Sequence, residues 1–224
     1  MNVEKVTLKQ INRSDALRYL GYGDTVPDDT TLLLLDKCEK ELLHHLDCKY
    51  LYRIFPLEGG QIPGSAYRLE GSSIASHLAG CTQIIFLCAT LSEGVDRLIR
   101  LKQITGMTEA MMTDALASSA IEQVCDTAER EIMKSFPGMQ HTFRFGLGYG
   151  DFPLEGQTAF LNILDARKRI GVSVSPSLML TPLKSVTCVI GLGEHVANES
   201  RKTCEVCSLK ESCAYRRAGR LCSQ

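Results

Sequence analysis

Apolar residues recur along much of the chain at the spacing of helices that bury one face. Between 32 and 46 a leucine or cysteine returns every three or four residues, and Asp28 and Asp29 stand where such a helix begins. The longest helix is predicted over 108–135, because Pro137 follows it and cannot continue it. The same reasoning predicts further helices over 72–78, after a capping Ser92, and over 154–169 with Gly171 as its end.

Runs of β-branched and aromatic residues predict strands between these helices. Residues 83–90 are almost entirely apolar, so we expect them at the centre of a sheet. Shorter runs predict strands at 3–9, 50–55, 66–69, 140–145, 172–174, 178–181 and 185–190. Several strands follow one another without an intervening helix. The pattern therefore favours an α+β fold in which helices pack on one face of a mainly antiparallel twisted sheet.

Composition and charge narrow the class of protein. The chain has 224 residues, 44% hydrophobic and 23% charged, which is typical of a globular protein that buries about 70% of its unfolded surface. A net charge of −1 argues against a general binder of nucleic acid or membranes. The sequence shows neither a bilayer-spanning apolar run nor a secretory signal. We expect a cytoplasmic protein with one domain over 1–196 and a cysteine-rich basic tail over 197–224.

The ten cysteines fall into two groups. The cytoplasm keeps thiols reduced, so a disulfide framework is not expected. Six cysteines stand singly among apolar neighbours and are interpreted as small buried hydrophobes: Cys38, Cys48, Cys81, Cys88, Cys125 and Cys188. The other four lie close together in the tail, as Cys204-x2-Cys207-x5-Cys213-x8-Cys222.

The four tail cysteines have the spacing of a metal site. Cys-x2-Cys places two thiolates on one turn, as zinc and iron–sulfur sites do, and the surrounding Lys and Arg residues favour thiolates. The full spacing matches neither a zinc ribbon nor a ferredoxin. Three alternatives stay open, namely an iron–sulfur cluster, a zinc ion and thiols without metal. The predicted metal ligands are Cys204, Cys207, Cys213 and Cys222.

The segment from Arg144 to Gly150, RFGLGYG, has the composition of a ligand-binding loop. Its glycines permit unusual backbone conformations and let backbone amides approach a ligand. Arg144 offers a planar fork to a carboxylate, and Tyr149 offers an aromatic face and a hydroxyl to a purine ring or a sulfonium. The spacing is not that of a dinucleotide-binding fingerprint. From composition alone, a glycine-rich turn with a surface arginine is the alternative.

Three motifs in order resemble the activation domain of vitamin B12-dependent methionine synthase. They are RFGLGYG, then RIGVSVSPS over 169–177, then Met179-x-x-Pro182-x-x-Ser185-Val186. The family carries an R-x-x-x-G-Y signature, a G-V-x-L-T-E-S strand and an M-x-P-x-x-S-V-S-G strand. The resemblance covers residues 107–191. It implies a free-standing homologue of this domain, with the α+β fold of that family.

The resemblance also implies that the loop binds S-adenosylmethionine. In the family, the arginine of the signature binds the carboxylate of the ligand, and this role falls on Arg144. The small residues and the tyrosine of the loop contact the nucleoside, and these roles fall on Gly146, Gly148 and Tyr149.

The sequence departs from the family at two positions. The family places a glutamate of the preceding helix against the amino group of the ligand, and Ser118 stands at that position here. Glu122, one turn later on the same helix face, is the alternative contact. Residues 175–177 read Ser-Pro-Ser where the family has Thr-Glu-Ser, so a second carboxylate is missing.

Cobalamin is expected on another protein. A base-off cobalamin carrier supplies its cobalt ligand from an Asp-x-His-x-x-Gly motif, and the near match at 75–80 has alanine in place of the aspartate. His77 is therefore interpreted as an ordinary histidine at a helix end. The implied partners are a corrinoid-binding methionine synthase subunit and a reductant protein, with neither nucleic acid nor membrane.

Two functions follow from these patterns. The first is reductive reactivation, in trans, of a cobalamin-dependent methionine synthase or related corrinoid methyltransferase, with S-adenosylmethionine as methyl donor. The chain would then be a component of a methyltransferase activity, inactive alone and without a catalytic residue of its own. The second is a non-enzymatic metal-binding redox or interaction module that has lost S-adenosylmethionine. The missing carboxylates favour the second function, whereas Arg144, Gly148 and Tyr149 favour the first.

Overall fold

A computed structural model of the protein describes residues 3–22, 25–196 and 211. The chain forms two compact units, each assembled from separate stretches of sequence. The first unit combines Met1–Tyr52, Leu87–Phe136 and Gln157–Thr187, and the second combines Arg53–Phe86, Pro137–Gly156 and Cys188–Gln224. The predicted tail over 197–224 lies outside the described residues except at position 211.

The larger sheet is antiparallel where its pairing is defined, and β3 lies at its centre. The strand order is β1-β2-β3-β8-β4, and β5 also pairs with β8. β1 runs antiparallel to β2, with Val3 opposite Leu51, and β4 and β5 both run antiparallel to β8. The predicted α+β class, with residues 83–90 as a central strand, is confirmed. The strands are β1 (Val3–Val6), β2 (Cys48–Pro56), β3 (Gln83–Thr90), β4 (Gln140–His141), β5 (Phe145–Gly146) and β8 (Ser185–Gly193).

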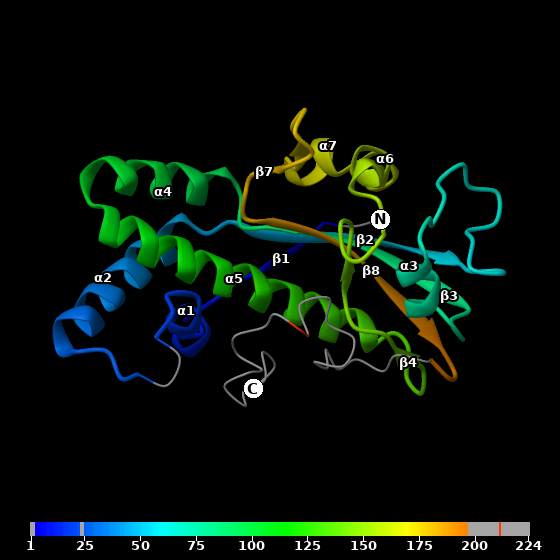
Figure 1. The fold of residues 1–224 in the computed structure, drawn as a ribbon, viewed down its shortest axis with the longest axis horizontal. Helices are drawn as coiled ribbons and strands as arrows, with labels where there is room; N and C mark the ends of the chain where they lie inside the picture. Colours follow the sequence, from blue (N-terminus) through cyan, green and yellow to red (C-terminus); the bar gives the residue numbers. More distant parts are fainter. Residues whose placement is uncertain (1–2, 23–24, 197–210, 212–224) are drawn as a thin grey trace. The chain divides into compact units, whose positions relative to one another are not determined.

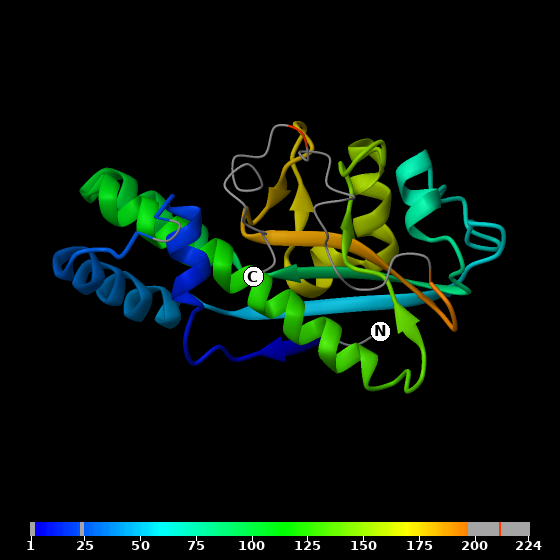
Figure 2. The same cartoon turned by 60° about the horizontal axis from the view of Figure 1, so that its bottom comes forward.

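Burial along β3 shows that this strand is covered on both faces. Residues 84–90 are all buried, although successive side chains of a strand point to opposite faces. Figures 1 and 2 show α5 (Met107–Met133) along one face, and α6 (Gln157–Leu164) and α7 (Ala166–Ile170) on the other. The expectation that the helices share one face is therefore wrong, because a strand that is apolar at every position needs cover on both sides.

Three helices of the first unit pack against α5. They are α1 (Arg13–Tyr19), α2 (Asp29–His45) and α4 (Glu93–Thr105). Asp28 caps α2 as predicted, because its carboxylate accepts a hydrogen bond from the Thr31 amide at 2.7 Å. α1 is absent from the sequence prediction, although the Asn12 side chain accepts hydrogen bonds from two amides of its first turn.

Ser92 precedes α4 but does not cap it. Its hydroxyl donates instead to the Asp47 carbonyl oxygen at 2.6 Å. The Ser92 backbone has a φ of 71°, a left-handed conformation that is unlike the extended backbone of an ordinary N-cap. The prediction of a serine cap is therefore wrong, although the position of the helix start is right.

The helix predicted over 154–169 is divided into three pieces. A 3-10 turn, Leu154–Gly156, precedes α6, and α7 follows after a break. The break lies at Asp165, whose φ of 51° is left-handed and ends the helical path. Gly171, at φ 74°, ends α7 as predicted.

Residues 66–69 form no strand, because a side chain takes the place of a neighbouring strand. The Gln61 amide group donates to the Leu69 carbonyl oxygen and accepts from the Leu69 amide, both at 3.3 Å. Tyr67 and Leu69 are buried while Arg68 is exposed, which explains the alternating pattern. The prediction of a strand is therefore wrong, although the alternation of buried and exposed residues on which it was based is present.

The strand predicted over 140–145 is interrupted at 143–144, directly after Thr142. Its amide donates to the Gly191 carbonyl oxygen at 3.0 Å, and its hydroxyl accepts from the Gly191 amide at 2.9 Å. The Thr142 hydroxyl thus accepts the hydrogen bond from Gly191 that a backbone carbonyl oxygen would accept in a regular strand. A small hairpin pairs β6 (Ser173–Val174) with β7 (Leu180–Thr181), within the predicted ranges. Among the described helices, none combines the length and apolar character that crossing a membrane requires.

Candidate functional site

The glycine-rich loop begins on the sheet and closes as a tight turn in the second unit. β5 fixes its start, since Phe145 lies opposite Val189 and Gly146 opposite Cys188. The Gly148 amide donates to the Phe152 carbonyl oxygen at 2.9 Å, and Gly148 has a φ of 84°. The turn therefore requires glycine at 148, as the sequence indicated.

Two amides of this loop are already used within it. The Gly148 amide binds the Phe152 carbonyl, and the Tyr149 amide donates to the Gly146 carbonyl oxygen at 3.2 Å. The expectation that glycines free the loop amides for a ligand is wrong at these two positions. The exposed Tyr149 side chain is then a group that the loop presents at the surface.

Tyr149 presents an aromatic ring at the surface of the second unit. The residue is 51% exposed, and its ring rests edge-on against Phe145, with 5.7 Å between ring centroids. Phe145 is buried and also contacts the Phe152 ring at 6.3 Å. A ring that is held from one side and open on the other can stack on a flat base or contact a sulfonium.

Behind Phe145 lies the ring of His77. α3 (Ser72–His77) ends at this residue, which is 2% exposed and contacts the Phe145 ring at 4.7 Å. Burial lowers the pKa of His77 to about 4, against a hydrogen bond with the Phe143 backbone that raises it. Its Nε2 atom has no hydrogen-bond partner among the described residues. A neutral histidine at a helix end agrees with the sequence interpretation.

The other end of α3 is bound by Asp151, a residue that the sequence analysis missed. One carboxylate oxygen accepts from the Ser72 amide and the Ser72 hydroxyl, each at 2.7 Å, and the other accepts from the Ser73 amide at 2.8 Å. The Ser72 hydroxyl and the two amides hold the pKa of Asp151 well below its usual range. The sequence signal was a loop glycine, Gly150, followed directly by an acid.

Gly150 is explained by this contact rather than by a ligand. A Cβ atom at this position would lie 2.3 Å from the Ser73 hydroxyl oxygen, and its φ is 57°. Gly71 is similarly crowded, because a Cβ there would lie 2.7 Å from the Asp151 carbonyl oxygen. Two of the glycines around this site therefore allow backbone segments to approach each other.

Arg144 and Gly146 lie at the base of the same loop, and both are partly buried. Arg144 directly precedes β5, so the sheet pairing of β5 fixes the position of its backbone. Arg144, Gly146, Gly148 and Tyr149 therefore lie in one loop of the second unit, and their contacts with a ligand stay predictions.

Ser118 and Glu122 belong to α5 in the first unit. The Ser118 hydroxyl donates to the Asp114 carbonyl oxygen at 3.0 Å and accepts from the Lys184 ammonium at 2.9 Å. Lys184 also pairs with the Asp114 carboxylate at 2.8 Å. Ser118 therefore uses its one donor within the protein, and the Lys184 cation occupies one of its two acceptor lone pairs.

Glu122 is partly buried and lies near α1. Burial and, after it, the negative charge of Glu122 raise the pKa of the Tyr19 hydroxyl. The small residues of α5 beside it admit the start of α1. The Ser119 hydroxyl donates to the Asn12 carbonyl oxygen at 2.9 Å, and Gln123 accepts from the Asn12 amide at the same distance. In this part of α5, the small residues therefore allow the backbone at the start of α1 to approach the helix closely.

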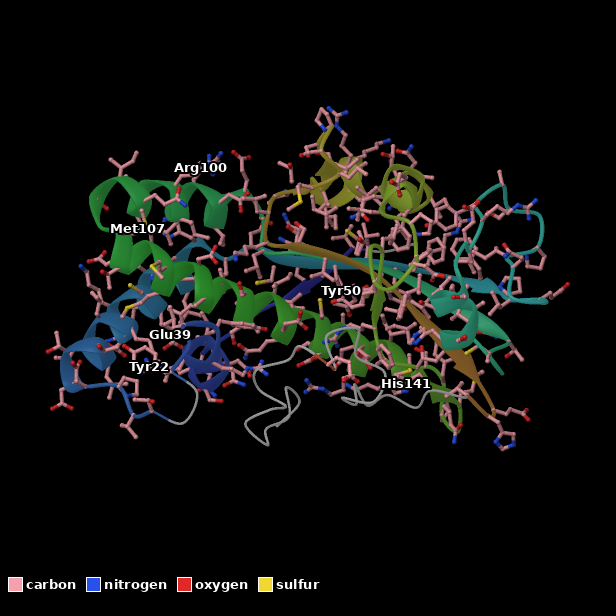
Figure 3. The ribbon with its side chains drawn as sticks, viewed as in Figure 1. Tyr22, Glu39, Tyr50, Arg100, Met107 and His141 are labelled. Atoms are coloured by element: carbon pink, nitrogen blue, oxygen red, sulfur yellow. The ribbon has the colours of Figure 1, made fainter. Side chains whose placement is uncertain are left out.

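A polar cavity of about 420 Å³ lies beside this contact. Its wall includes Glu39, which is 4% exposed and accepts hydrogen bonds from the Ile11 amide at 2.8 Å and from Arg13 Nε at 2.5 Å. Figure 3 shows Glu39 on α2 beside α1. The hydrogen bonds of Glu39 are thus made within the protein. The lining residues are Gln10, Ile11, Asn12, Arg13, Glu39 and Gln123.

The hairpin turn at 175–177 uses its serines internally. The Ser175 hydroxyl lies 2.9 Å from the Ser177 hydroxyl and accepts from the Met179 amide at 3.2 Å. The Ser175 amide donates to the Met179 carbonyl oxygen at 2.8 Å. The Ser-Pro-Ser sequence therefore builds the turn between β6 and β7.

The predicted metal ligands Cys204, Cys207, Cys213 and Cys222 lie outside the described residues. Within the part of the chain that the structure describes, no group of three or more His, Cys, Asp or Glu residues could hold a metal ion. The single cysteines behave as predicted, since five are buried and Cys81 is partly buried. Burial raises the pKa of Cys48 to about 12 and that of Cys81 to about 11, so both thiols are poor ligands.

Comparison with known proteins finds a similar fold among solved structures. No family model matches the chain, and no curated protein matches it. Among solved structures, the chain is similar to the crystal structure of the MetH reactivation domain bound to AdoHcy. The two are 15% identical with a TM-score of 0.63, and the match covers 98% of this chain and 86% of the other. The chain therefore has the fold of the methionine synthase reactivation domain, the family that its motifs resemble.

Proposed function

We propose that this protein binds S-adenosylmethionine and reactivates, in trans, a cobalamin-dependent methionine synthase or a related corrinoid methyltransferase. One observation carries the proposal: the RFGLGYG loop stands on a fold whose solved counterpart was crystallised with AdoHcy bound. A fold alone does not imply a function, whereas the side chains of a loop can select a ligand. The side chains of the RFGLGYG loop complement an amino-acid carboxylate and a flat base.

The residues of the loop fit the ligand in charge and shape. Arg144 would bind the carboxylate as a charge-assisted, bidentate pair. The half-exposed ring of Tyr149 would lie against the nucleoside, and Gly146 and Gly148 leave room beside it. Ser118 and Glu122 stay predictions for the amino group, and the Ser118 hydroxyl already accepts a hydrogen bond from Lys184.

The chain contributes position rather than acid–base chemistry to this reaction. A cobalamin carried by the partner would supply the nucleophile that accepts the methyl group. Arg144 and Tyr149 would orient the sulfonium so that its methyl points at that partner, and closure against the partner would exclude water. Loss of the methyl group leaves a neutral thioether, S-adenosylhomocysteine. A reductant protein supplies the electron that precedes the transfer.

The test combines the purified protein with a corrinoid methionine synthase subunit in the cob(II)alamin state, S-adenosylmethionine and a low-potential reductant. We expect a change in the corrinoid absorbance and release of S-adenosylhomocysteine, and neither without the protein. The protein alone should release none. Arg144→Ala should weaken S-adenosylmethionine binding by about 2 kcal/mol, measured by calorimetry, because the carboxylate loses its charged partner. Equal methylation with and without the protein would contradict the proposal.

A second function is favoured by Ser118 and by the tail. The Lys184 ammonium lies 2.9 Å from the hydroxyl at the position where the family places a carboxylate, and the tail carries four closely spaced cysteines. These features suit a non-enzymatic redox or interaction module that binds an iron–sulfur cluster or zinc and no longer binds S-adenosylmethionine. Calorimetry separates the two functions, because the second requires that no S-adenosylmethionine binding is detected.

A further inference from the structure

α3 holds the glycine-rich loop at two points within the second unit. At its first residues, the amides of Ser72 and Ser73 and the Ser72 hydroxyl all donate to the Asp151 carboxylate, over distances of 2.7 to 2.8 Å. At its last residue, the His77 ring contacts Phe143 at 4.5 Å and Phe145 at 4.7 Å. One short helix therefore binds the chain on both sides of the exposed segment 148–150.

Backbone hydrogen bonds close the turn that carries the exposed segment 148–150. Gly148, Tyr149 and Gly150 are exposed, and the Tyr149 side chain contacts the protein through the Phe145 ring. The backbone turn is closed by the bonds among Gly146, Gly148, Tyr149 and Phe152, and Asp151 lies inside this turn. The direction of the Tyr149 ring thus depends on what holds Asp151 and Phe145.

The local sequence is adapted to this contact. Gly71 and Gly150 have φ values of 118° and 57°, and a Cβ atom on either would collide with the opposite segment. Asp151 also donates its amide to the Ser73 hydroxyl at 3.4 Å, so the bonding runs in both directions. A carboxylate is needed here, because both oxygens accept and no donor is required.

We propose that Asp151 is a positioning residue that fixes the ligand-binding loop by clamping it to α3. The clamp holds Tyr149 in the orientation in which its ring can receive the ligand, a role that rests on the proposed function. Asp151 itself does not touch the ligand. Its carboxylate acts through Ser72 and Ser73.

The test compares two Asp→Asn variants of the whole protein. Asp151→Asn keeps the size of the side chain but turns one acceptor into a donor that faces the amide of Ser72 or of Ser73. Asp28→Asn is the matched control, because Asp28 also accepts an amide at a helix start, at 2.7 Å from Thr31, but lies in the first unit. S-adenosylmethionine affinity is measured by calorimetry, and amide hydrogen exchange is followed in the ligand-free proteins.

We expect Asp151→Asn to weaken S-adenosylmethionine binding at least tenfold and to speed exchange at the amides of Ser72, Ser73, Gly148 and Phe152. Exchange in α5 should stay unchanged, and Asp28→Asn should bind with wild-type affinity. Asp151→Glu should restore part of the affinity, since it keeps two acceptors. A purely local cap without a role in positioning would speed exchange and leave the affinity as it was.

Wild-type affinity in Asp151→Asn would overturn the proposal, and so would weaker binding without faster loop exchange. If Asp151→Asn does not fold, Ser72→Ala removes only the hydroxyl bond and should weaken binding several-fold, whereas an unchanged affinity would count against the clamp. Absence of binding in the wild type would reject the proposed function instead. Amide exchange in the loop of the ligand-free Asp151→Asn variant, compared with the wild type, would then test by itself whether Asp151 holds the loop on α3.

Discussion

The imidazole of His77 lies among aromatic rings in the second unit, with 2% of the residue exposed. Burial lowers its pKa from 6.5 to about 4, so the folded protein binds this proton less tightly than the unfolded chain does. The contribution to stability is complete above pH 6.5 and is lost as the pH falls toward 4. As the pH falls from 6.5 to 4, we expect the free energy of unfolding to decrease by roughly 3 kcal/mol, measured by urea denaturation at a series of pH values.

His77→Phe should remove this pH dependence, because the replacement has no proton to bind. The exposed His44 provides the control, since His44→Phe should leave the slope between pH 4 and 6.5 unchanged. The carboxylate of Asp151, whose pKa is lowered, affects stability only at still lower pH. An identical slope in His77→Phe and the wild type would show that another group causes the pH dependence.

At this scale, the sequence shows which residues of the loop are neighbours, whereas contacts between distant residues could not be predicted from it. Arg144, Gly148 and Tyr149 lie within six residues, so their chemistry could be interpreted directly from the sequence. Asp151 and Ser72 are separated by 79 positions, and nothing in either segment specifies the other. The same holds for Lys184 and Ser118, which are 66 positions apart and whose contact changes the expected role of Ser118.

At the scale of elements, hydrophobic spacing was sufficient to predict a helix or strand wherever its backbone groups bond to other backbone groups. β3 matches its predicted range of 83–90, and α2 begins directly after its capping Asp28. The errors arise where a side chain replaces a backbone partner. Gln61 takes the place of a strand beside 66–69, and Ser92 binds Asp47 instead of capping α4. Hydrophobic periodicity does not show where a side chain takes the place of a backbone partner, because the pattern of buried residues is the same in both cases.

Lys102 joins three helices of the first unit. Its ammonium, on α4, lies 2.6 Å from the Glu41 carboxylate on α2 and 2.7 Å from the Glu109 carboxylate on α5, and 9% of its side chain is exposed. Hydrogen bonds to Glu109 and then to Glu41 raise the pKa of Lys102, so it stays charged. Lys102→Met leaves the two carboxylates facing each other. We expect a loss of roughly 1–2 kcal/mol of unfolding free energy, a value reduced because both glutamates are partly exposed.

Arg97 on the same helix gives the comparison for this prediction. Its pair with Glu93 spans 3.9 Å, and both side chains are about two-thirds exposed or more. Arg97→Met should change the unfolding free energy by less than about 0.5 kcal/mol. Equal effects of the two substitutions would mean that Lys102 acts through its aliphatic stem, not through its charge.

At the scale of the whole molecule, the fold is retained although few residues are. The chain shares 15% of its residues with the MetH reactivation domain over 98% of its length. What both need is a core of the same pattern, and cores tolerate extensive exchange of apolar residues when burial is kept. The RFGLGYG loop is different, because its proposed chemistry depends on single side chains. The similarity thus shows the fold, whereas the roles proposed for Arg144 and Tyr149 depend on the binding experiments.

The four tail cysteines carry the last prediction, which concerns the composition of the native protein. The spacing Cys204-x2-Cys207 among basic residues is typical of zinc and iron–sulfur sites, so protein purified without oxygen should contain stoichiometric iron with sulfide, or zinc. Metal analysis and absorbance spectra distinguish the two. Cys204→Ser or Cys207→Ser should abolish the metal, whereas Cys81→Ser, a partly buried thiol elsewhere in the chain, should retain it. A well-folded native sample without metal would contradict both metal alternatives and leave the tail as free thiols.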